Sequence, residues 1–297
     1  MSLVINRNMM AMNATRHLNN HYGRLSTSTE RLSSGLRINT AADDAAGLAI
    51  RELMRADISA LNQGVRNAND AISLIQTADG ALQIVDEKLI RMQELAEQAA
   101  TGTYFSDQRL MIESEYQAMA SEITRIANAT DFNSIYLLNG NLSSTTHDGS
   151  GLVSYGKLKV HFGSGNDCSE DYYYVTIGCS TASALGVGNQ AETSADAYTV
   201  STQQAAQRAV AAIRQAIDSK DKIRAHLGAI QNRLENTISN LQIQAENMTA
   251  AESRISDVDV ATEMTEFVRN QVLTQAAVAM LSQANSLPQM AMQLIQG

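Results

Sequence analysis

Two histidines are the residues of this sequence whose spacing best suits chemistry. His17 and His21 are four residues apart, so on a helix they share one face and could bind a metal ion together. The zinc-protease pattern requires Glu directly after the first histidine, and residue 18 is Leu. We therefore interpret both as polar residues beside Leu18 and Tyr22, and we predict no metal, no cofactor and no catalytic residue.

The two cysteines, Cys168 and Cys179, are the other reactive groups. If residues 172–179 form one strand, that strand spans about 23 Å at ~3.3 Å per residue. A disulfide needs Cα atoms within about 7 Å, so an intramolecular bridge requires the strand to fold back. We predict a buried thiol at Cys179 and an exposed one at Cys168, with a bond between subunits as the alternative.

Composition argues against several classes of protein. Gly163-Ser164-Gly165 is too short for a phosphate-binding loop, and an enzyme is the least supported class. The net charge of −9 argues against a nucleic-acid partner. No stretch approaches the roughly 20 apolar residues that span a membrane. The first eight residues lack the features of a secretory signal, which predicts a chain that is cytoplasmic or exported without a cleaved signal.

The chain divides into three regions by composition. Residues 1–139 and 200–297 are rich in Ala, Leu and Gln and poor in Gly, which predicts helices. Residues 140–188 hold nine of the 17 glycines, which predicts strands and turns. There Leu158, Val160 and Phe162 alternate with polar residues, and a turn at residues 163–167 leads to a returning apolar face, so we expect a β-hairpin.

Apolar residues in the first region follow an alternation of four and three residues. The first stripe consists of Ala11, Thr15, Leu18, Tyr22, Leu25, Thr29 and Leu32. It ends at Gly35, which suits a helix end. The pattern restarts and predicts a helix from about Ala46 to Ala99, roughly 80 Å long at ~1.5 Å per residue. Ser106-Asp107 is typical of the cap of a further helix that ends near Asn128.

The last region repeats this pattern in a returning helix and in a terminal stripe. That terminal stripe consists of Leu273, Ala277, Met280, Ala284, Leu287, Ala291 and Leu294. Pro288 lies within it and predicts a kink or a local break.

These elements predict a mainly α fold, an elongated antiparallel long-helix bundle or coiled coil with a small β-hairpin region. The terminal helices pair with each other, bury little surface and are expected to order only in an assembly. A head-to-tail contact that does not close would then produce a helical filament. We expect assembly to depend on the stripe residues Leu18, Leu25, Leu32, Leu273, Met280, Leu287 and Leu294.

Motifs at both ends resemble those of bacterial flagellins. They are LSTSTERLSSGLRIN at 25–39, DDAAGLAI at 43–50, LGAIQNRLE at 227–235, RNQ at 269–271 and QANSLPQ at 283–289. The resemblance covers about residues 1–140 and 200–297, and it implies a short flagellin without large outer domains. The parts implied are an N-terminal core helix (1–33), a spoke linker (34–46), central helices of an outer tube (47–139), a short variable region (140–199), a returning central helix (200–255) and a C-terminal core helix (256–297).

The resemblance also implies a function and partners. The chain would be exported unfolded and would polymerise with itself into the extracellular flagellar filament that drives swimming. An export chaperone, the filament cap and the junction proteins would be further partners. A hook–filament junction protein and a cytoplasmic signalling coiled coil are the alternatives.

A host receptor is a further candidate partner by resemblance. The flagellin-sensing Toll-like receptor would contact Arg91, Leu95 and Glu115, although Ile90 and Gln93 depart from the family's pattern. In the alternative interpretation, Arg91 and Glu115 belong to an ordinary helix surface and join neighbouring subunits.

Overall fold

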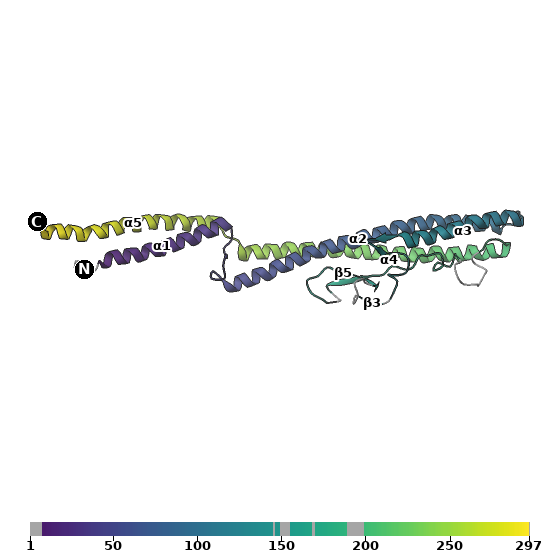
Figure 1. Cartoon of the computed structure of the whole chain (residues 1–297), viewed down its shortest axis with the longest axis horizontal. Coiled ribbons are helices and arrows are strands. Elements are labelled where there is room, and N and C mark those ends of the chain that lie inside the picture. The colour runs from purple at the N-terminus through teal and green to yellow at the C-terminus, as the bar shows by residue number, and fades with distance from the viewer. Residues whose placement is uncertain (1–7, 145, 149–154, 168–169, 189–198, 297) are drawn as a thin grey trace. The chain divides into compact units, whose positions relative to one another are not determined.

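Five helices make up most of the chain that the computed structural model describes, which is residues 8–144, 146–148, 155–167, 170–188 and 199–296. They are α1 (Met9–Ser34), α2 (Ala45–Ala100), α3 (Ser106–Ala129), α4 (Gln203–Ser256) and α5 (Val260–Gln296) (Figure 1). The predicted mainly α fold is confirmed. The chain forms two compact units, one of residues 1–58 with 246–297 and one of residues 59–245.

Most helix ends lie where the sequence predicts them. Gly35 caps α1 with a φ of 72°, and its N–H donates to the Arg31 carbonyl at 2.9 Å. At the start of α3 the cap is Phe105 rather than Ser106-Asp107, and the Phe105 N–H donates to Gln108 Oε1 at 3.1 Å. The helix therefore begins one residue earlier than a Ser106 cap would allow.

The predicted break in the last helix does not occur. Helix α5 continues through position 288 without interruption. No described helix is long and apolar enough to cross a membrane.

The second unit is built on α2, α3 and α4, which pack together as predicted. One apolar cluster joins all three helices, and its fully buried members include Leu89, Met92, Tyr116, Ile123 and Ile213. A second cluster joins α2 and α4 to the strand region, through Leu74, Leu82, Leu138, Ile177 and Leu234 among others. This apolar packing stabilises long helices that would be marginal by themselves.

Charged side chains also connect α2 with α4. The Lys220 side chain is only 2% exposed, and its Nζ lies 2.5 Å from Asp86 Oδ1 and 2.8 Å from Asp221 Oδ1. Arg224 Nε lies 2.7 Å from Asp79 Oδ1. A buried ammonium group is tolerated only with such partners, so the pairs favour one register of α4 along α2.

Three small antiparallel pairs follow α3. They are β1 (Asp131–Phe132) with β2 (Ile135–Tyr136), β3 (His147–Asp148) with β4 (Tyr155–Gly156), and β5 (Leu158–His161) with β6 (Tyr172–Val175). The β5–β6 pair confirms the predicted hairpin, with Val160 opposite Tyr173 and Leu158 opposite Val175.

The prediction of a buried Cys179 thiol is wrong. Strand β6 ends at Val175, so Cys179 does not share its apolar face and is only half-buried. Its Sγ lies 3.4 Å from Thr181 Oγ1. Cys168 lies outside the described residues.

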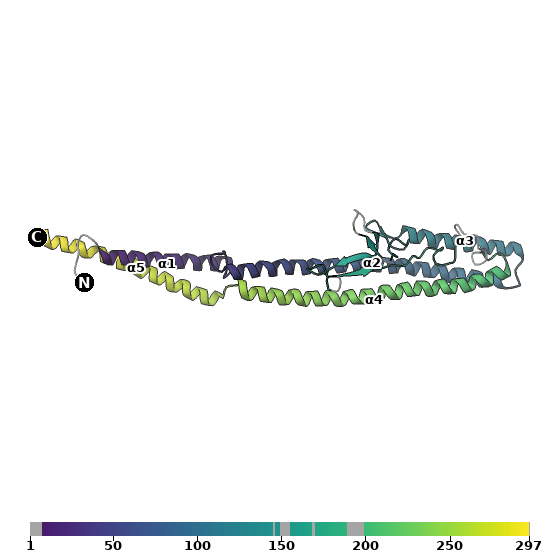
Figure 2. The same ribbon diagram turned by 90° about the horizontal axis from the view of Figure 1, so that it is seen from below.

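The hairpin docks closely on α2 and α4 (Figure 2). Asn67 Nδ2 donates to the His161 carbonyl at 2.8 Å, and the Arg233 guanidinium lies 3.5 Å from the centre of the Tyr173 ring. Gly64 lets the backbones approach, because a Cβ at that position would lie 1.9 Å from the Phe162 carbonyl oxygen. Residue 64 must therefore lack a side chain.

Two glycine substitutions in α2 should have opposite effects on stability. Gly64→Ala should lower the free energy of unfolding by about 1–3 kcal/mol, because the added methyl collides with backbone. Gly80→Ala should raise it by about 0.5–1 kcal/mol, because no atom lies within 4 Å of the new Cβ and alanine favours the helix. Urea unfolding followed by circular dichroism measures both changes. Equal effects would contradict the close docking of the hairpin.

Candidate assembly surface

Helices α1 and α5 lie side by side in the first unit (Figure 1). Buried and half-buried positions of α1 recur with alternating steps of three and four. The row with these steps consists of Ala11, Ala14, Leu18, His21, Leu25, Ser28 and Leu32, and Thr27 and Arg31 beside it are also half-buried. The matching positions of α5 are Glu263, Phe267, Asn270, Thr274, Ala277, Leu281 and Ala284. We call these two rows the seam.

The predicted stripes share only alternate positions with this seam. Thr15, Tyr22 and Thr29 are exposed, and the smaller or more polar Ala14, His21 and Ser28 take their places. Small side chains permit close approach of two helices, whereas a tyrosine ring in the same row would separate them. The predicted register of α1 is therefore wrong at every second position.

The same correction applies to α5. Ala277 and Ala284 lie in the seam as predicted, but Leu273 is 36% exposed and Met280 is 63% exposed. The side chains of Leu287 and Leu294 lie outside the described part of the structure. The leucine and methionine of the predicted stripe thus point away from α1.

The seam itself contains little apolar surface. Its buried members among the described side chains are Ser28, Asn270, Thr274 and Ala284. The Thr274 hydroxyl donates to the Asn270 carbonyl at 2.7 Å, so its polar group is satisfied within α5. Hydrophobic stabilisation scales with the apolar area removed from water, so this pair is held more weakly than the α2–α4 packing.

Large apolar side chains instead cover the outside of α1 and α5. The exposed set is Met9, Met10, Met12, Tyr22, Val260, Met264, Val268, Val272, Leu273, Val278, Met280 and Met290. Large apolar patches exposed on a soluble protein mark interaction sites. We call this set the exposed apolar face.

Two grooves flank the seam. One has a volume of about 470 Å³ and is lined mainly by apolar residues, among them Met9, Met10, Leu273 and Met280. The other is lined mainly by polar residues, including Asn19 and Asn285.

The two histidines face the apolar groove. His17 and His21 both line it, and His21 Nδ1 is buried without a hydrogen-bond partner among the described residues. No group of three or more His, Cys, Asp or Glu side chains that could hold a metal occurs in the part of the chain described.

The connector after α1 and the short connector before α5 run together. Backbone hydrogen bonds join Arg37 N to the Ser256 carbonyl at 2.7 Å and Val258 N to the Gly35 carbonyl at 3.1 Å. Because these hydrogen bonds join backbone groups, no pattern of side chains in the sequence predicts them. We call this paired segment the joint.

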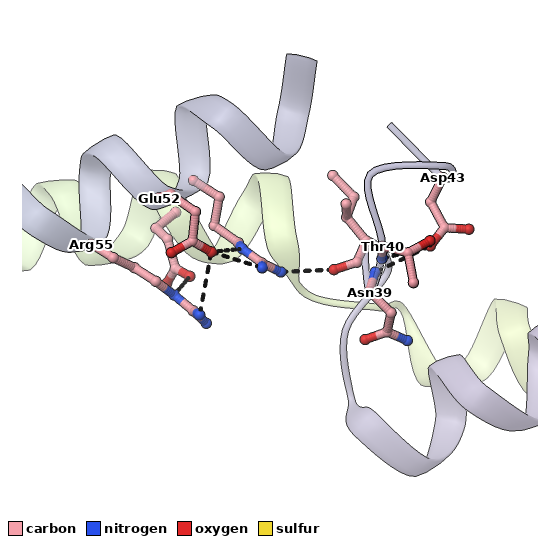
Figure 3. A network of polar contacts seen from close by, with 8 residues as sticks. Asn39, Thr40, Asp43, Glu52 and Arg55 are labelled. Atoms are coloured by element: carbon pink, nitrogen blue, oxygen red, sulfur yellow. Dashed lines mark hydrogen bonds and ion pairs between the residues drawn. The ribbon is translucent and has the colours of Figure 1, made fainter. Parts of the chain in front are cut away.

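Next to the joint, side-chain hydrogen bonds stabilise the rest of the loop between α1 and α2 (Figure 3). Asp43 Oδ2 accepts hydrogen bonds from the backbone N–H groups of Thr40 at 3.0 Å and Asn39 at 3.2 Å, and these bonds lower the pKa of Asp43. The buried Arg51 donates from Nη1 to the Ile38 carbonyl at 2.7 Å. The loop after α1 is therefore held in a defined conformation.

The second unit contains the candidate receptor residues. Arg91 Nη2 lies 2.7 Å from Glu115 Oε1, joining α2 to α3, and Arg91 Nη1 lies 2.9 Å from Glu94. The bonds with Glu115 raise the pKa of Arg91. The structure brings Arg91 and Glu115 together on the surface, but Leu95 is 1% exposed and packs in the core, so its side chain is not accessible to a partner.

Comparison with known proteins identifies the family. The description "Bacterial flagellin N-terminal helical region" matches residues 5–143, and "Bacterial flagellin C-terminal helical region" matches residues 210–295. The chain is 41% identical over 293 residues to a flagellar filament 33 kDa core protein of Treponema phagedenis, covering 99% of this chain and 100% of the relative. It is 43% identical over 293 residues to a flagellin of Halalkalibacterium halodurans, with the same coverage.

A solved structure is also similar. The crystal structure of Bacillus cereus flagellin matches with a TM-score of 0.46 and 28% identity, over 63% of this chain and 94% of that one. The two family descriptions and the full-length relatives account for both ends of the sequence. The chain belongs to the bacterial flagellin family, whose members are structural, non-enzymatic subunits of the flagellar filament, which is extracellular or, in the spirochaete homologues, periplasmic.

Proposed function

We propose that the α1–α5 pair is the surface through which this filament subunit polymerises. The observation that carries the proposal is the contrast between the weakly apolar seam and the exposed apolar face. Leu273 and Met280 would contact neighbouring subunits directly. Leu18, Leu25 and Leu32 are half-buried in the seam and would support the pair, and Leu287 and Leu294 stay predicted assembly residues.

The terminal helices would order only when a neighbour covers them. A thin pair of helices with polar buried residues provides little stability of its own. Burial of the exposed apolar face by neighbouring subunits would supply the missing stabilisation. Monomers would thus remain available for export, and polymerisation would begin where a template already exists.

Each part of the chain would occupy its own layer of the filament. Residues 1–33 and 256–297 would form the inner core, with residues 34–46 as the spoke. Residues 47–139 and 200–255 would build the outer tube, and residues 140–199 would be its short variable surface. An export chaperone, the filament cap and the junction proteins would act on the same terminal helices, since these are the segments that expose apolar surface in the monomer.

Truncation of either end should abolish polymerisation and leave a folded helical monomer. Deletion of residues 1–32 or 262–297 removes one member of the α1–α5 pair but none of the apolar clusters of the second unit. Negative-stain electron microscopy after addition of salt or filament seeds would test for filaments, and circular dichroism would test for helix. Filaments formed by either truncated protein would refute the proposal.

A single substitution on the exposed apolar face should weaken assembly selectively. Met280→Gln removes apolar surface worth about 1.5–3 kcal/mol when buried, which corresponds to a roughly tenfold or greater rise in the critical concentration for polymerisation. Met280→Leu keeps that surface and should polymerise almost normally. Sedimentation of polymer over a range of subunit concentrations measures both. If the two variants behaved alike, Met280 would not be a contact residue.

We also propose that Arg91 and Glu115 form a contact site for the flagellin-sensing Toll-like receptor. The pair is exposed and lies across two rigid helices, an arrangement suited to recognition. The role of Leu95 would be to hold α2 in place from the core. The alternative is that the pair joins neighbouring subunits.

The receptor proposal is tested with purified monomer on receptor-expressing reporter cells. Arg91→Ala should raise the half-maximal concentration about tenfold, since arginines at interface centres are frequent hot spots. Arg125→Ala is the matched control, because Arg125 is also an exposed arginine paired with a glutamate, Glu122 on α3. Loss of filaments without loss of signalling in Arg91→Ala would instead favour the subunit contact.

A further inference from the structure

The outer face of the β5–β6 hairpin gathers cationic and aromatic side chains. In an antiparallel pair, residues directly opposite each other project to the same side. Lys159 is opposite Tyr174 and His161 is opposite Tyr172, so these four side chains share one face. The intervening pair, Val160 and Tyr173, faces the core.

The rings and ammonium groups of this face contact one another. Lys159 Nζ lies 3.7 Å from the centre of the Tyr172 ring, and Lys157 Nζ lies 5.9 Å from that of Tyr174. The two tyrosine rings meet edge to face with centroids 5.4 Å apart. His161 stacks on Tyr172 at 6.0 Å, and the His147 ring of β3 lies 5.5 Å from Tyr174. We call these six residues the cationic–aromatic face.

The composition of this face differs from that of the rest of the chain. The whole sequence has five lysines and a net charge of −9, yet two of the lysines lie two positions apart here. Two of the five histidines accompany them. The face therefore concentrates positive charge in a chain that is acidic as a whole.

Nearby carboxylates do not neutralise the two lysines. Within the described residues, neither Lys157 nor Lys159 forms an ion pair, and Lys159 Nζ lies 3.4 Å from the neutral Asn166 Oδ1. Asp171, after the turn, accepts hydrogen bonds from the backbone of Gly165 at 3.2 Å and Asp167 at 2.8 Å. The ammonium groups are therefore available to an anionic partner.

We propose that the cationic–aromatic face binds a polysaccharide that carries carboxylate groups. The exposed Tyr174 ring suits the C–H surface of a sugar ring, and the two ammonium groups supply the charge complement. Lys157 and Lys159 are about 7 Å apart along the extended chain and on the same side of it, so one anionic chain can contact both ammonium groups. Double-stranded DNA carries a negative charge about every 1.7 Å, a density that two lysines about 7 Å apart do not match.

The test uses the full-length monomer and immobilised polygalacturonate at low ionic strength. The double substitution Lys157→Gln/Lys159→Gln should weaken binding about tenfold or more, since each exposed charge pair and its stacking partner contribute modestly. Lys88→Gln/Lys222→Gln changes the net charge equally at other sites and should bind as the parent does. Lys157→Arg/Lys159→Arg keeps the charge and should retain binding.

A second variant separates the aromatic from the electrostatic contribution. Tyr174→Val removes the ring but keeps a residue that favours strands, and should weaken binding several-fold. Circular dichroism and urea unfolding verify that each variant folds. Raising the salt concentration should weaken binding of the parent, because exposed charges are screened.

Four results would overturn the proposal. They are no binding of the parent to polygalacturonate, equal binding to neutral dextran, tighter binding to single-stranded poly(dT), and equal loss in the Lys88/Lys222 control. The measurement uses monomers, so its outcome is independent of polymerisation through α1 and α5.

Discussion

The return of α4 along α2 is the packing interaction on which the rest of the structure depends. It buries the apolar clusters that hold α3 and the hairpin, and the Lys220–Asp86 pair favours one register. Within the first unit the same two helices are joined by Arg55 and Glu252, 2.9 Å apart. Because α2 leads away from α1 and α4 leads back to α5, two segments from opposite ends of the chain enter one unit.

The two units differ in how they use apolar residues. In the second unit the leucines and isoleucines of the two apolar clusters are buried, and there the hydrophobic effect works within the chain. In the terminal helices the buried positions are small or polar, and the large apolar side chains are outside. A filament subunit needs this division, since one part must be stable alone while another must gain stability from neighbours.

Local signals in the sequence were sufficient for the helices but not for their contacts. The ends of α1 and α2 were predictable because glycine and capping residues act on the backbone within one helical turn of their own position. Half of the seam was predictable, because the predicted stripe and the observed seam both alternate steps of three and four and so have every second position in common. A prediction that favours apolar residues places Tyr22 in the seam, whereas the close packing of two helices favours small residues such as Ser28.

The pairing of the long helices was predictable from the sequence, but the contacts of individual side chains between distant segments were not. The burial of Lys220 and Leu95 depends on which helices surround them, and a periodic pattern does not contain that information. The hairpin was predictable from its alternation, but the end of β6 at Val175 was not, since apolar residues continue past it to Ile177.

The hydrogen bond from Asn8 Nδ2 to the Ala284 carbonyl, 2.8 Å long, connects residues 276 positions apart. A contact between residues so far apart in the sequence closes a loop that contains almost the whole chain. The entropic cost of closing a loop rises with its length. The hairpin and the α2–α3 contacts close much shorter loops. Folding should therefore proceed from the middle of the sequence outward, with the two termini meeting last, and a subunit that arrives at a growing end would complete its fold there.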